Sequence, residues 1–274
     1  MNRQEQILYL NKVLLEEMPE YKEFAEKFAQ DVESQRRLLR SLMNLRLPMP
    51  LRASFLTIQD ELLTEEVKHK GIIKLDELPT VSNDSLAKSE QLILWQGDIT
   101  RLAVDAIVNA ANSAMLGCFA PCHGCIDNAI HSAAGLQLRN ACADIMIKQG
   151  HEEPTGQAKI TPAFNLPCKY VIHTVGPIVQ SEPTPEDIDM LKSCYISCLN
   201  LAQQYNLKSV AFCCISTGEF HFSNKLAAEI AIKSVTDWIV QNNSNIKVIF
   251  NVFKDIDLQI YRELLSKSEK FLRR

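Results

Sequence analysis

Apolar residues recur at helical spacing through the first part of the chain. Between residues 21 and 32 they stand three and four positions apart, the pattern of an amphipathic helix. The stripe continues to residue 45 and stops before Pro48 and Pro50, which cannot continue a helix. Residues 55–71 repeat the spacing and end on a glycine. We therefore expect an α-helical N-terminal extension over residues 1–87, helical through residues 1–47, with its apolar stripe packed on the rest of the protein.

From residue 91 the pattern alternates between short β-branched runs and longer helical segments. Strands are expected at 92–95, 106–109, 157–161, 170–175, 210–215 and 246–253. Helices are expected at 126–149, 185–205, 224–240 and 257–271. Strands separated by helices of this length predict a three-layer α/β/α domain over residues 88–274, with a mixed or mainly parallel central sheet. A polar passage around residues 79–89 links this domain to the helical extension.

Composition narrows the function classes. The net charge of −4 provides no broad attraction for nucleic acid, so we expect no nucleic-acid partner. No apolar run approaches the roughly 20 residues that span a bilayer, so no membrane association is expected either. Nine cysteines without a secretory signature at the start of the chain predict reduced thiols in a cytoplasmic protein, some of them available to metal.

Four potential metal ligands lie between the expected strand at 106–109 and the helix that starts at residue 126. They are Cys118, Cys122, His123 and Cys125, at the place where α/β sheets bind their ligands. Structural zinc sites use four protein ligands, whereas catalytic sites use three and leave one position open. We predict a Zn²⁺ cofactor on Cys118, His123 and Cys125, with Cys122 as an undecided fourth ligand. The alternative is a set of free cysteines buried in the core.

The motifs around this loop resemble those of the macrodomains, which are ADP-ribose-binding modules. GDIT at 97–100, VDAIVNAANS at 104–113, IDNAIH at 126–131 and ISTG at 215–218 stand in the order typical of that family. The glycine-rich loop usual in the family is replaced by GCFAPCHGC at 117–125. This loop is similar to that of the zinc-dependent microbial macrodomains, which remove ADP-ribose from proteins and carry a helical N-terminal extension. The resemblance therefore implies a macrodomain fold and a protein-ADP-ribose hydrolase.

The resemblance also implies roles for residues that follow the expected strands. Asp98 and Ile99 would bind adenine, and Phe253 would stack on it. The alternatives are an Asp98 that stabilises its turn or caps a helix, and a Phe253 that belongs to the core. Small residues before a helix let backbone amides approach phosphate oxygens. The segment that would bind the diphosphate in this way consists of Ser216, Thr217, Gly218, Glu219 and Phe220.

Asn112 and Asp127 are the polar residues nearest the candidate metal loop, and the resemblance places them beside the distal ribose as catalytic residues. An Asn side chain can orient a ribose hydroxyl as donor and acceptor together. A carboxylate close to a cation stays ionised and can orient or deprotonate water. Alternatively, Asn112 only bridges its loop and Asp127 caps the helix that it begins. Cys125 and Ile126 would line the facing side of the substrate cleft.

The predicted activity is the zinc-dependent hydrolysis of mono-ADP-ribose from modified protein side chains, with the mono-ADP-ribosylated protein as partner. Zinc would either orient a ribose oxygen or lower the pKa of a bound water. The alternatives are a non-catalytic ADP-ribose reader and a protein with a purely structural zinc. The resemblance further implies a lipoyl-carrier, GcvH-like substrate (the glycine-cleavage H type) and a sirtuin-type ADP-ribosyltransferase as functional partner. His131 and His173 are expected to be satisfied structural histidines.

Overall fold

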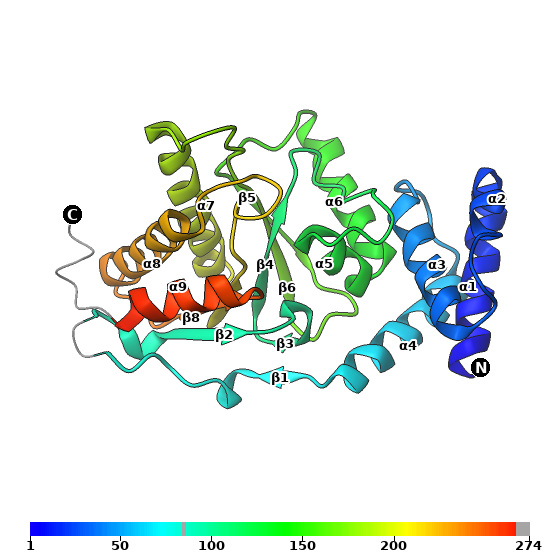
Figure 1. Cartoon of the computed structure of the whole chain (residues 1–274), viewed down its shortest axis with the longest axis horizontal. Coiled ribbons are helices and arrows are strands. Elements are labelled where there is room, and N and C mark those ends of the chain that lie inside the picture. The colour runs from blue at the N-terminus through cyan, green and yellow to red at the C-terminus, as the bar shows by residue number, and fades with distance from the viewer. Residues whose placement is uncertain (84–85, 267–274) are drawn as a thin grey trace.

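A six-stranded mixed sheet forms the centre of the computed structural model, which describes residues 1–83 and 86–266 (Figure 1). The strand order is β2-β8-β7-β4-β6-β5. The strands are β2 (Leu92–Gln96), β4 (Ala106–Ala111), β5 (Ala158–Pro162), β6 (Tyr170–Val175), β7 (Ser209–Phe212) and β8 (Lys247–Val252). Among these strands only β5 pairs antiparallel to its neighbour. The carboxyl ends of the other strands therefore meet at one edge of the sheet.

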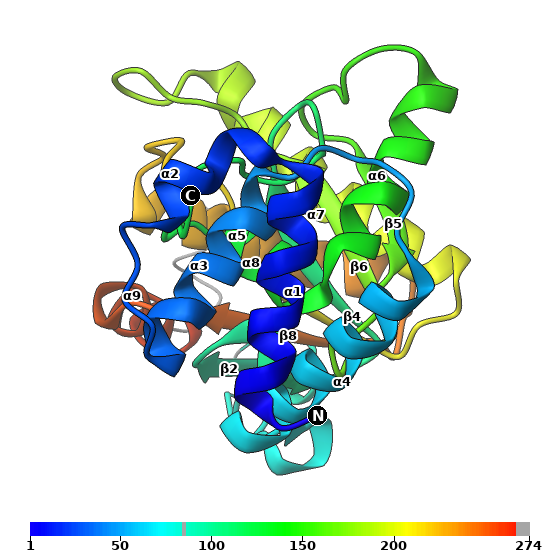
Figure 2. The ribbon, with the colours of Figure 1, turned by 90° about the vertical axis from the view of Figure 1, so that its right-hand side faces the viewer.

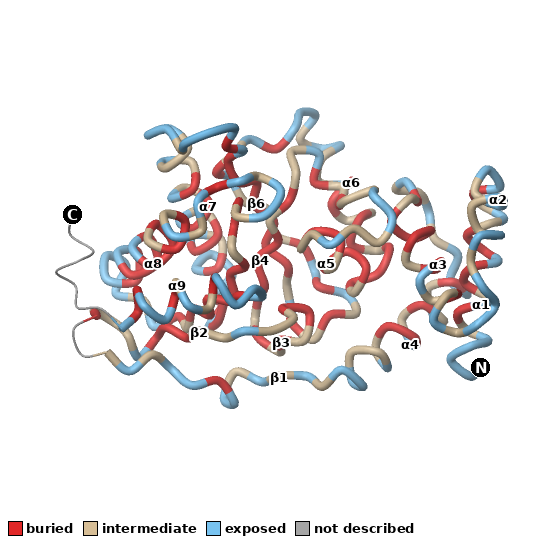
Figure 3. Tube along the Cα trace, in the orientation of Figure 1, coloured by how far each residue is buried: buried red, intermediate tan, exposed pale blue. Residues whose placement is uncertain are grey.

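Helices cover both faces of this sheet. On one side lie α5 (Ile126–Ala134) and α6 (Leu136–Gln149). On the other side lie α7 (Pro185–Gln204), α8 (Asn224–Gln241) and α9 (Asp255–Ser266) (Figure 1). Strands covered on both faces are apolar almost throughout, and every residue of β7 is buried. Figure 3 shows the buried positions gathered along the strands and the inner sides of the helices. The predicted three-layer α/β/α arrangement with a mixed sheet is confirmed.

The N-terminal region is helical, as predicted, and contains a hydrophobic cluster of its own. Its longer helices are α1 (Arg3–Glu17), α3 (Val32–Leu45) and α4 (Ala53–Lys70), and the last of these ends at Gly71 with a φ of 82°. Figure 2 shows α1 and α3 lying outside α5. The apolar side chains of these helices pack together, and Leu136 of α6 joins them. The N-terminal stripe therefore packs mainly among these helices, and Leu136 is the buried residue of α6 through which the cluster also contacts the rest of the protein.

The prediction of one helix through residues 1–47 is wrong. A 3-10 turn (Pro19–Tyr21) and the single-turn helix α2 (Lys22–Ala25) separate α1 from α3. Asp31 has an extended backbone, and its side chain accepts a hydrogen bond from the Ser34 amide at 2.9 Å. Because this is the geometry of a helix N-cap, α3 starts anew at Val32 instead of continuing the preceding helix.

The predicted helix over residues 126–149 is two helices that break at Gly135. This glycine has a φ of +94°, in the left-handed region that favours glycine. A Cβ atom at Gly135 would lie 2.7 Å from both Gln59 Nε2 and Gln137 Oε1. The chain therefore turns at this residue while the apolar spacing continues past it, so the pattern alone does not reveal the break.

Smaller differences concern strand ends and short elements. The strand β7 ends at Phe212, three residues before the predicted end. A short parallel pair, β1 (Ile73–Lys74) with β3 (Leu102–Ala103), was not expected. The predicted end of the last helix, at residue 271, lies outside the described residues. Further 3-10 turns are Leu75–Glu77, Ser89–Gln91 and Ile99–Arg101. In the described parts of the chain, no helix combines the length and the apolar character needed to cross a bilayer.

Candidate active site

The carboxyl edge of the sheet gathers most of the predicted site residues. Asp98 follows β2, Asn112 follows β4, and Phe253 follows β8. The loop over residues 213–223 connects β7 to α8 at the same edge. Parallel strands of an open α/β sheet bind ligands at this edge. The sheet topology therefore brings together loops that lie far apart in the sequence.

The predicted metal ligands form a compact group. The sulfur atoms of Cys118 and Cys125 and a ring nitrogen of His123 all lie within 4.8 Å of one another, and all three residues are half-buried. The Nδ1 atom of His123 is buried without a hydrogen-bond partner in the described chain, whereas Nε2 lies 3.7 Å from a carboxylate oxygen of Glu219. Two thiols and an unpartnered imidazole nitrogen fit the ligand preference of Zn²⁺. The residues present therefore suit this ion.

Cys122 does not belong to this group. Its backbone has a φ of 52°, and its sulfur lies 3.3 Å from the hydroxyl of Ser41. Its amide donates a hydrogen bond to Asn44 Oδ1 at 2.9 Å. The side chain thus contacts α3 instead of the other donors, so three ligands converge, as in a catalytic zinc site with an open position. The alternative of cysteines buried in the core is wrong for this loop, because Cys118, Cys122 and Cys125 are all partly exposed.

Cys125 also begins the helix α5. Its sulfur accepts the amide hydrogen of Asn128 at 3.4 Å, so the N-cap is this cysteine, and the alternative of Asp127 as the cap is wrong. Burial raises the pKa of the Cys125 thiol to about 12, and Cys118 and Asp127 act in the same direction. A bound cation acts in the opposite direction, because metal coordination deprotonates a thiol. Without a nearby cation, the Cys125 thiol is therefore protonated at neutral pH.

Asp127 is buried beneath the loop, and its carboxylate faces the interior. Its Oδ1 atom accepts a hydrogen bond from Asn109 Nδ2 at 2.8 Å and lies 3.5 Å from His131 Nε2. Burial raises the pKa of Asp127 to about 6, although the Asn109 hydrogen bond and the charge of Arg139 act to lower it. Asp127 is therefore a carboxyl group poised to change protonation in the physiological range. Asn109 is a polar contact that the sequence interpretation missed, although it lies within the VDAIVNAANS motif.

A second group of possible ligands, His131, Cys142 and His173, is fully buried. Both ring nitrogens of His173 already have partners, Asn109 Nδ2 at 3.2 Å and Thr161 Oγ1 at 3.0 Å. This histidine is satisfied and structural, as predicted, so neither of its nitrogens is free for a metal. The prediction of a satisfied histidine is wrong for His131, because neither of its nitrogens has a hydrogen bond within the described residues.

Asn112 bridges its loop. Its Oδ1 atom accepts hydrogen bonds from the amides of Ala114 and Met115 at 3.1 and 3.2 Å. Its Nδ2 atom donates to the Gly117 carbonyl at 3.3 Å. The loop-bridging alternative is therefore observed, and it fixes the start of the segment that carries Cys118.

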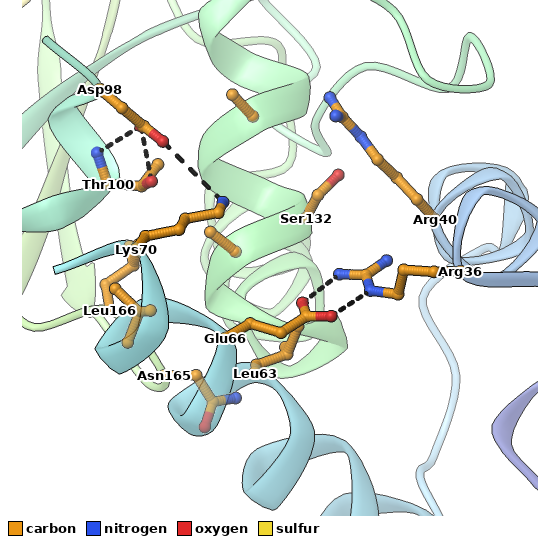
Figure 4. Close-up of a pocket in the computed structure, with 13 residues that line it drawn as sticks. Arg36, Arg40, Leu63, Glu66, Lys70, Asp98, Thr100, Ser132, Asn165 and Leu166 are labelled. Carbon is orange, nitrogen blue, oxygen red and sulfur yellow. Dashed lines mark hydrogen bonds and ion pairs between the residues drawn. The ribbon is translucent and has the colours of Figure 1, made fainter. Parts of the chain in front are cut away.

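Asp98 forms one wall of a small pocket (Figure 4). Its Oδ1 atom accepts hydrogen bonds from the Thr100 amide and hydroxyl at 3.0 and 2.6 Å, which is the turn-stabilising role considered from sequence. Its Oδ2 atom forms an ion pair with Lys70 Nζ at 3.9 Å. The pocket has a volume of about 140 Å³ and lies between α3, α4 and α5. Ile99 is buried, whereas Phe253 is 75% exposed, so the alternative of a core phenylalanine is wrong.

The loop at residues 216–220 presents backbone donors. Within the described chain, the amides of Gly218, Glu219 and Phe220 have no hydrogen-bond acceptor. Ser216 has a φ of 64°, and its buried hydroxyl is likewise unpartnered in the described chain. Successive free amides in a turn form a concavity that suits phosphate oxygens. Glu219 also faces His123, so this loop lies directly beside the group of metal ligands.

Comparison with known proteins shows the family. The Macro domain family matches residues 108–231. The protein-ADP-ribose hydrolase of Treponema medium is 52% identical over 266 residues, which is 97% of this chain and 100% of that protein. The chain belongs to the macro domain family. The protein-ADP-ribose hydrolase of Staphylococcus aureus strain Mu50 is 47% identical to this macrodomain protein over 84% of each chain.

Solved structures agree with this family. The Trypanosoma brucei macrodomain in complex with ADP-ribose superposes with a TM-score of 0.65 at 28% sequence identity. The superposition covers 80% of this chain and 93% of that chain. In the macrodomain described here, the segment matched by the family runs from β4 to α8, so it contains both the metal-ligand loop and the loop at 216–220. The N-terminal helices precede that segment but lie within the 97% of the chain aligned with the Treponema relative.

Proposed function

We propose that this macrodomain protein is a zinc-dependent hydrolase that removes mono-ADP-ribose from modified protein side chains. Relatives up to 52% identical carry the name protein-ADP-ribose hydrolase, and a solved neighbour contains ADP-ribose. The observation that carries the proposal is the group of Cys118, His123 and Cys125 beside the loop at 216–220. This arrangement supports a cation next to an anion-binding loop, at the distal end of a nucleotide-sugar ligand.

The proposed substrate contacts follow the carboxyl edge of the sheet. The Oδ2 atom of Asp98, which lies 3.9 Å from Lys70 Nζ, would accept a hydrogen bond from the adenine amino group. Ile99 would support the ring, and the exposed Phe253 would stack on it. The loop at 216–220 would bind the diphosphate through its free amides. Cys125 and Ile126 would line the facing side.

The chemistry concerns the bond between C1″ of the distal ribose and the acceptor side chain. Asn112 would orient the distal ribose while it bridges its own loop. Zn²⁺ on Cys118, His123 Nδ1 and Cys125 would supply Lewis acidity, which orients an oxygen ligand or lowers the pKa of bound water. Asp127, whose burial raises its pKa to about 6, would orient the attacking water and take up its proton once its carboxylate turns from Asn109 toward that water. Water adds to C1″, and the acceptor leaves with a proton.

An open coordination position is the feature that distinguishes a catalytic zinc site, as proposed here, from a structural zinc site. A structural site would use a fourth protein ligand, and Cys122 faces α3 instead. On the resemblance alone, we also propose the GcvH-like lipoyl carrier as substrate and the sirtuin-type transferase as functional partner. The division into a helical extension (1–87) and a macrodomain (88–274) is likewise part of the proposal.

The test combines metal analysis with a release assay. The purified protein should contain about one zinc per chain and should release ADP-ribose from a mono-ADP-ribosylated protein. Treatment with a chelator and the Cys125→Ala substitution should both abolish release, whereas Cys168→Ala, a buried thiol in the turn between β5 and β6, should retain it. Undiminished release by metal-free protein would refute the zinc step. Binding of ADP-ribose without any release would identify a reader.

A further inference from the structure

The N-terminal helix α3 contacts the metal-ligand loop, residues 118–125, directly. We propose that Asn44 and Arg40 of α3 are positioning residues for the zinc ligands, and that Cys122 is the point at which the loop is anchored to this helix. The inference rests on the proposed zinc site and assigns a role to the N-terminal helices. In this arrangement the helices form one wall of the catalytic machinery.

Cys122 adopts a backbone conformation that needs support. Its φ of 52° lies in the left-handed region, which is unfavourable for residues with a side chain. Such conformations persist when the surroundings hold them in place. Among the described residues, the hydrogen bonds that Cys122 makes all go to α3. They are the Asn44 Oδ1 atom at 2.9 Å from the Cys122 amide, the Ser41 hydroxyl at 3.3 Å from the sulfur, and the Arg37 carbonyl at 3.5 Å from the sulfur.

Asn44 joins the loop to α5. Its side chain is 1% exposed, and both of its ends are hydrogen-bonded. The Oδ1 atom accepts from the Cys122 amide, and the Nδ2 atom donates to the Ser132 hydroxyl at 3.0 Å. A buried amide that satisfies two partners at once fixes the distance between them. Asn44 therefore determines how far the tip of the loop stands from the helix that Cys125 begins.

Arg40 holds the other side of the tip. Its Nη2 atom donates to the backbone carbonyl of His123 at 3.3 Å and to Asn128 Oδ1 at 2.7 Å. Asn128 in turn donates to the Ala120 carbonyl at 2.9 Å, and its amide donates to the Cys125 sulfur at 3.4 Å. The Arg40 guanidinium group thus contacts the backbone of the predicted ligand His123 directly. It contacts the second ligand, Cys125, through Asn128.

These contacts clamp the loop between α3 and α5, which lie next to each other (Figure 2). The clamp holds Cys122 away from the ion and leaves the other three donors grouped together. Groups that orient metal ligands commonly contribute 10- to 100-fold to metal affinity. We therefore expect Asn44→Ala and Arg40→Lys to weaken zinc binding by about 10- to 100-fold.

The experiment measures zinc affinity by chelator competition and hydrogen exchange of residues 118–125 in the full chain. Gln59→Ala is the matched control, because Gln59 is a buried amide that also joins the N-terminal helices to the rest of the protein. It accepts from the Leu136 amide at 2.9 Å and has no contact with the loop. Asn44→Ala should lose zinc affinity and exchange the Cys122 amide faster. Gln59→Ala should leave both unchanged, even where its melting temperature falls.

The outcomes separate this inference from the proposed function. Equal zinc affinity and equal loop exchange in Asn44→Ala and Gln59→Ala would overturn the positioning role, and Arg40→Lys decides the question if Asn44→Ala does not fold. Cys122→Ser should still bind one zinc, and loss of that zinc would show that Cys122 is a ligand and overturn the anchor. A wild-type protein that binds no zinc would refute the proposed function, whereas the exchange measurement would still report on the clamp.

Discussion

The Nε2 atom of His123 lies 3.7 Å from a carboxylate oxygen of Glu219. This contact joins the two loops of the candidate active site, which are separated by α5, α6, β5, β6, α7 and β7 in the chain. A histidine that binds a metal through one nitrogen commonly donates its other N–H to a carboxylate, which orients the ring. Glu219 is 67% exposed, so solvent screens the interaction.

The first prediction follows from this contact. Glu219→Gln should weaken zinc binding by less than about tenfold, at the low end of the range for groups that orient a metal ligand. The effect should shrink as ionic strength rises, because an exposed carboxylate is screened by salt. Chelator competition at low and high salt checks both statements. A loss of affinity that does not depend on salt would show that Glu219 acts through packing and not through its charge.

A second prediction concerns the close approach of Gly176 to the loop at 216–220. A Cβ atom at Gly176 would overlap the Ser216 hydroxyl and lie 2.8 Å from Ile215 Cγ2. Gly176→Ala should therefore displace the loop and cost about 1–3 kcal/mol of stability, the usual range for overpacking. It should also raise the Kd for ADP-ribose about tenfold, which corresponds to about 1.4 kcal/mol. Calorimetric titration and urea unfolding provide the two measurements.

Gly150→Ala is the control for this substitution. Gly150 has a φ of 75° at the end of α6, but a Cβ atom there would meet nothing within 4 Å. The Gly150→Ala variant should lose up to about 1 kcal/mol of stability, because alanine is unfavourable at a positive φ. It should bind ADP-ribose as the wild type does. Equal ADP-ribose affinities in the two variants would contradict the proposed role of the loop.

A third prediction concerns Glu66, which ties α4 to α1 and α3. It accepts two hydrogen bonds from Arg36 at 2.8 Å and one from Arg3 at 2.9 Å. Burial acts to raise the pKa of Glu66, but these partners outweigh it and lower the pKa. Glu66 keeps some solvent contact, which weakens its interactions. Glu66→Gln should therefore lower the free energy of unfolding by about 1–2 kcal/mol at pH 7. Urea unfolding measures this loss.

The loss should depend on pH in a defined direction. A carboxyl group with a lowered pKa in the folded state stabilises the protein above its unfolded value of about 4.5, and this contribution disappears as the pH falls through the folded pKa. Wild type and Glu66→Gln should therefore converge in stability below pH 4.5. The exposed pair of Lys233 and Asp237 is the control, and Asp237→Asn should change stability by less than about 0.5 kcal/mol.

A fourth prediction concerns His173. Complete burial lowers its pKa to about 3, from an ordinary value of 6.5. Between these values the unfolded chain binds a proton that the folded protein does not, so stability falls as the pH is lowered from 6.5 toward 3. The slope from this residue is at most about 1.4 kcal/mol per pH unit. The imidazole proton shifts of His173 should stay constant from pH 7.5 to 5, and a midpoint near 6.5 would contradict its burial as a neutral group.

Much of the fold and of the metal group could be predicted because the signals are local. Cys118, His123 and Cys125 lie within eight positions, so a single loop brings them together regardless of the surrounding structure. The strands beneath are short, buried runs, and their alternation with helices predicts the layers. The residues at the strand ends could be located for the same reason.

The remainder depends on contacts between distant parts of the chain. Cys122 looks like its neighbours in the sequence, and contacts with Arg37, Ser41 and Asn44, about 80 positions earlier, turn it away from the ligand group. The break at Gly135 is not visible in the sequence pattern, because helical spacing continues through it. The interior setting of Asp127, through Asn109, likewise needs the packed structure. A one-dimensional pattern contains no information about such partners.

The contacts between the start of α6 and the N-terminal region have a consequence for the solubility of the protein. Leu136 is buried with the N-terminal cluster, Arg139 donates to the Met43 carbonyl at 2.8 Å, and Asn140 donates to the Met49 carbonyl at 2.9 Å. A polypeptide that begins at residue 88 would expose this apolar and cationic patch to solvent and would tend to aggregate. The N-terminal helices therefore serve the rest of the protein by keeping this patch of α6 covered.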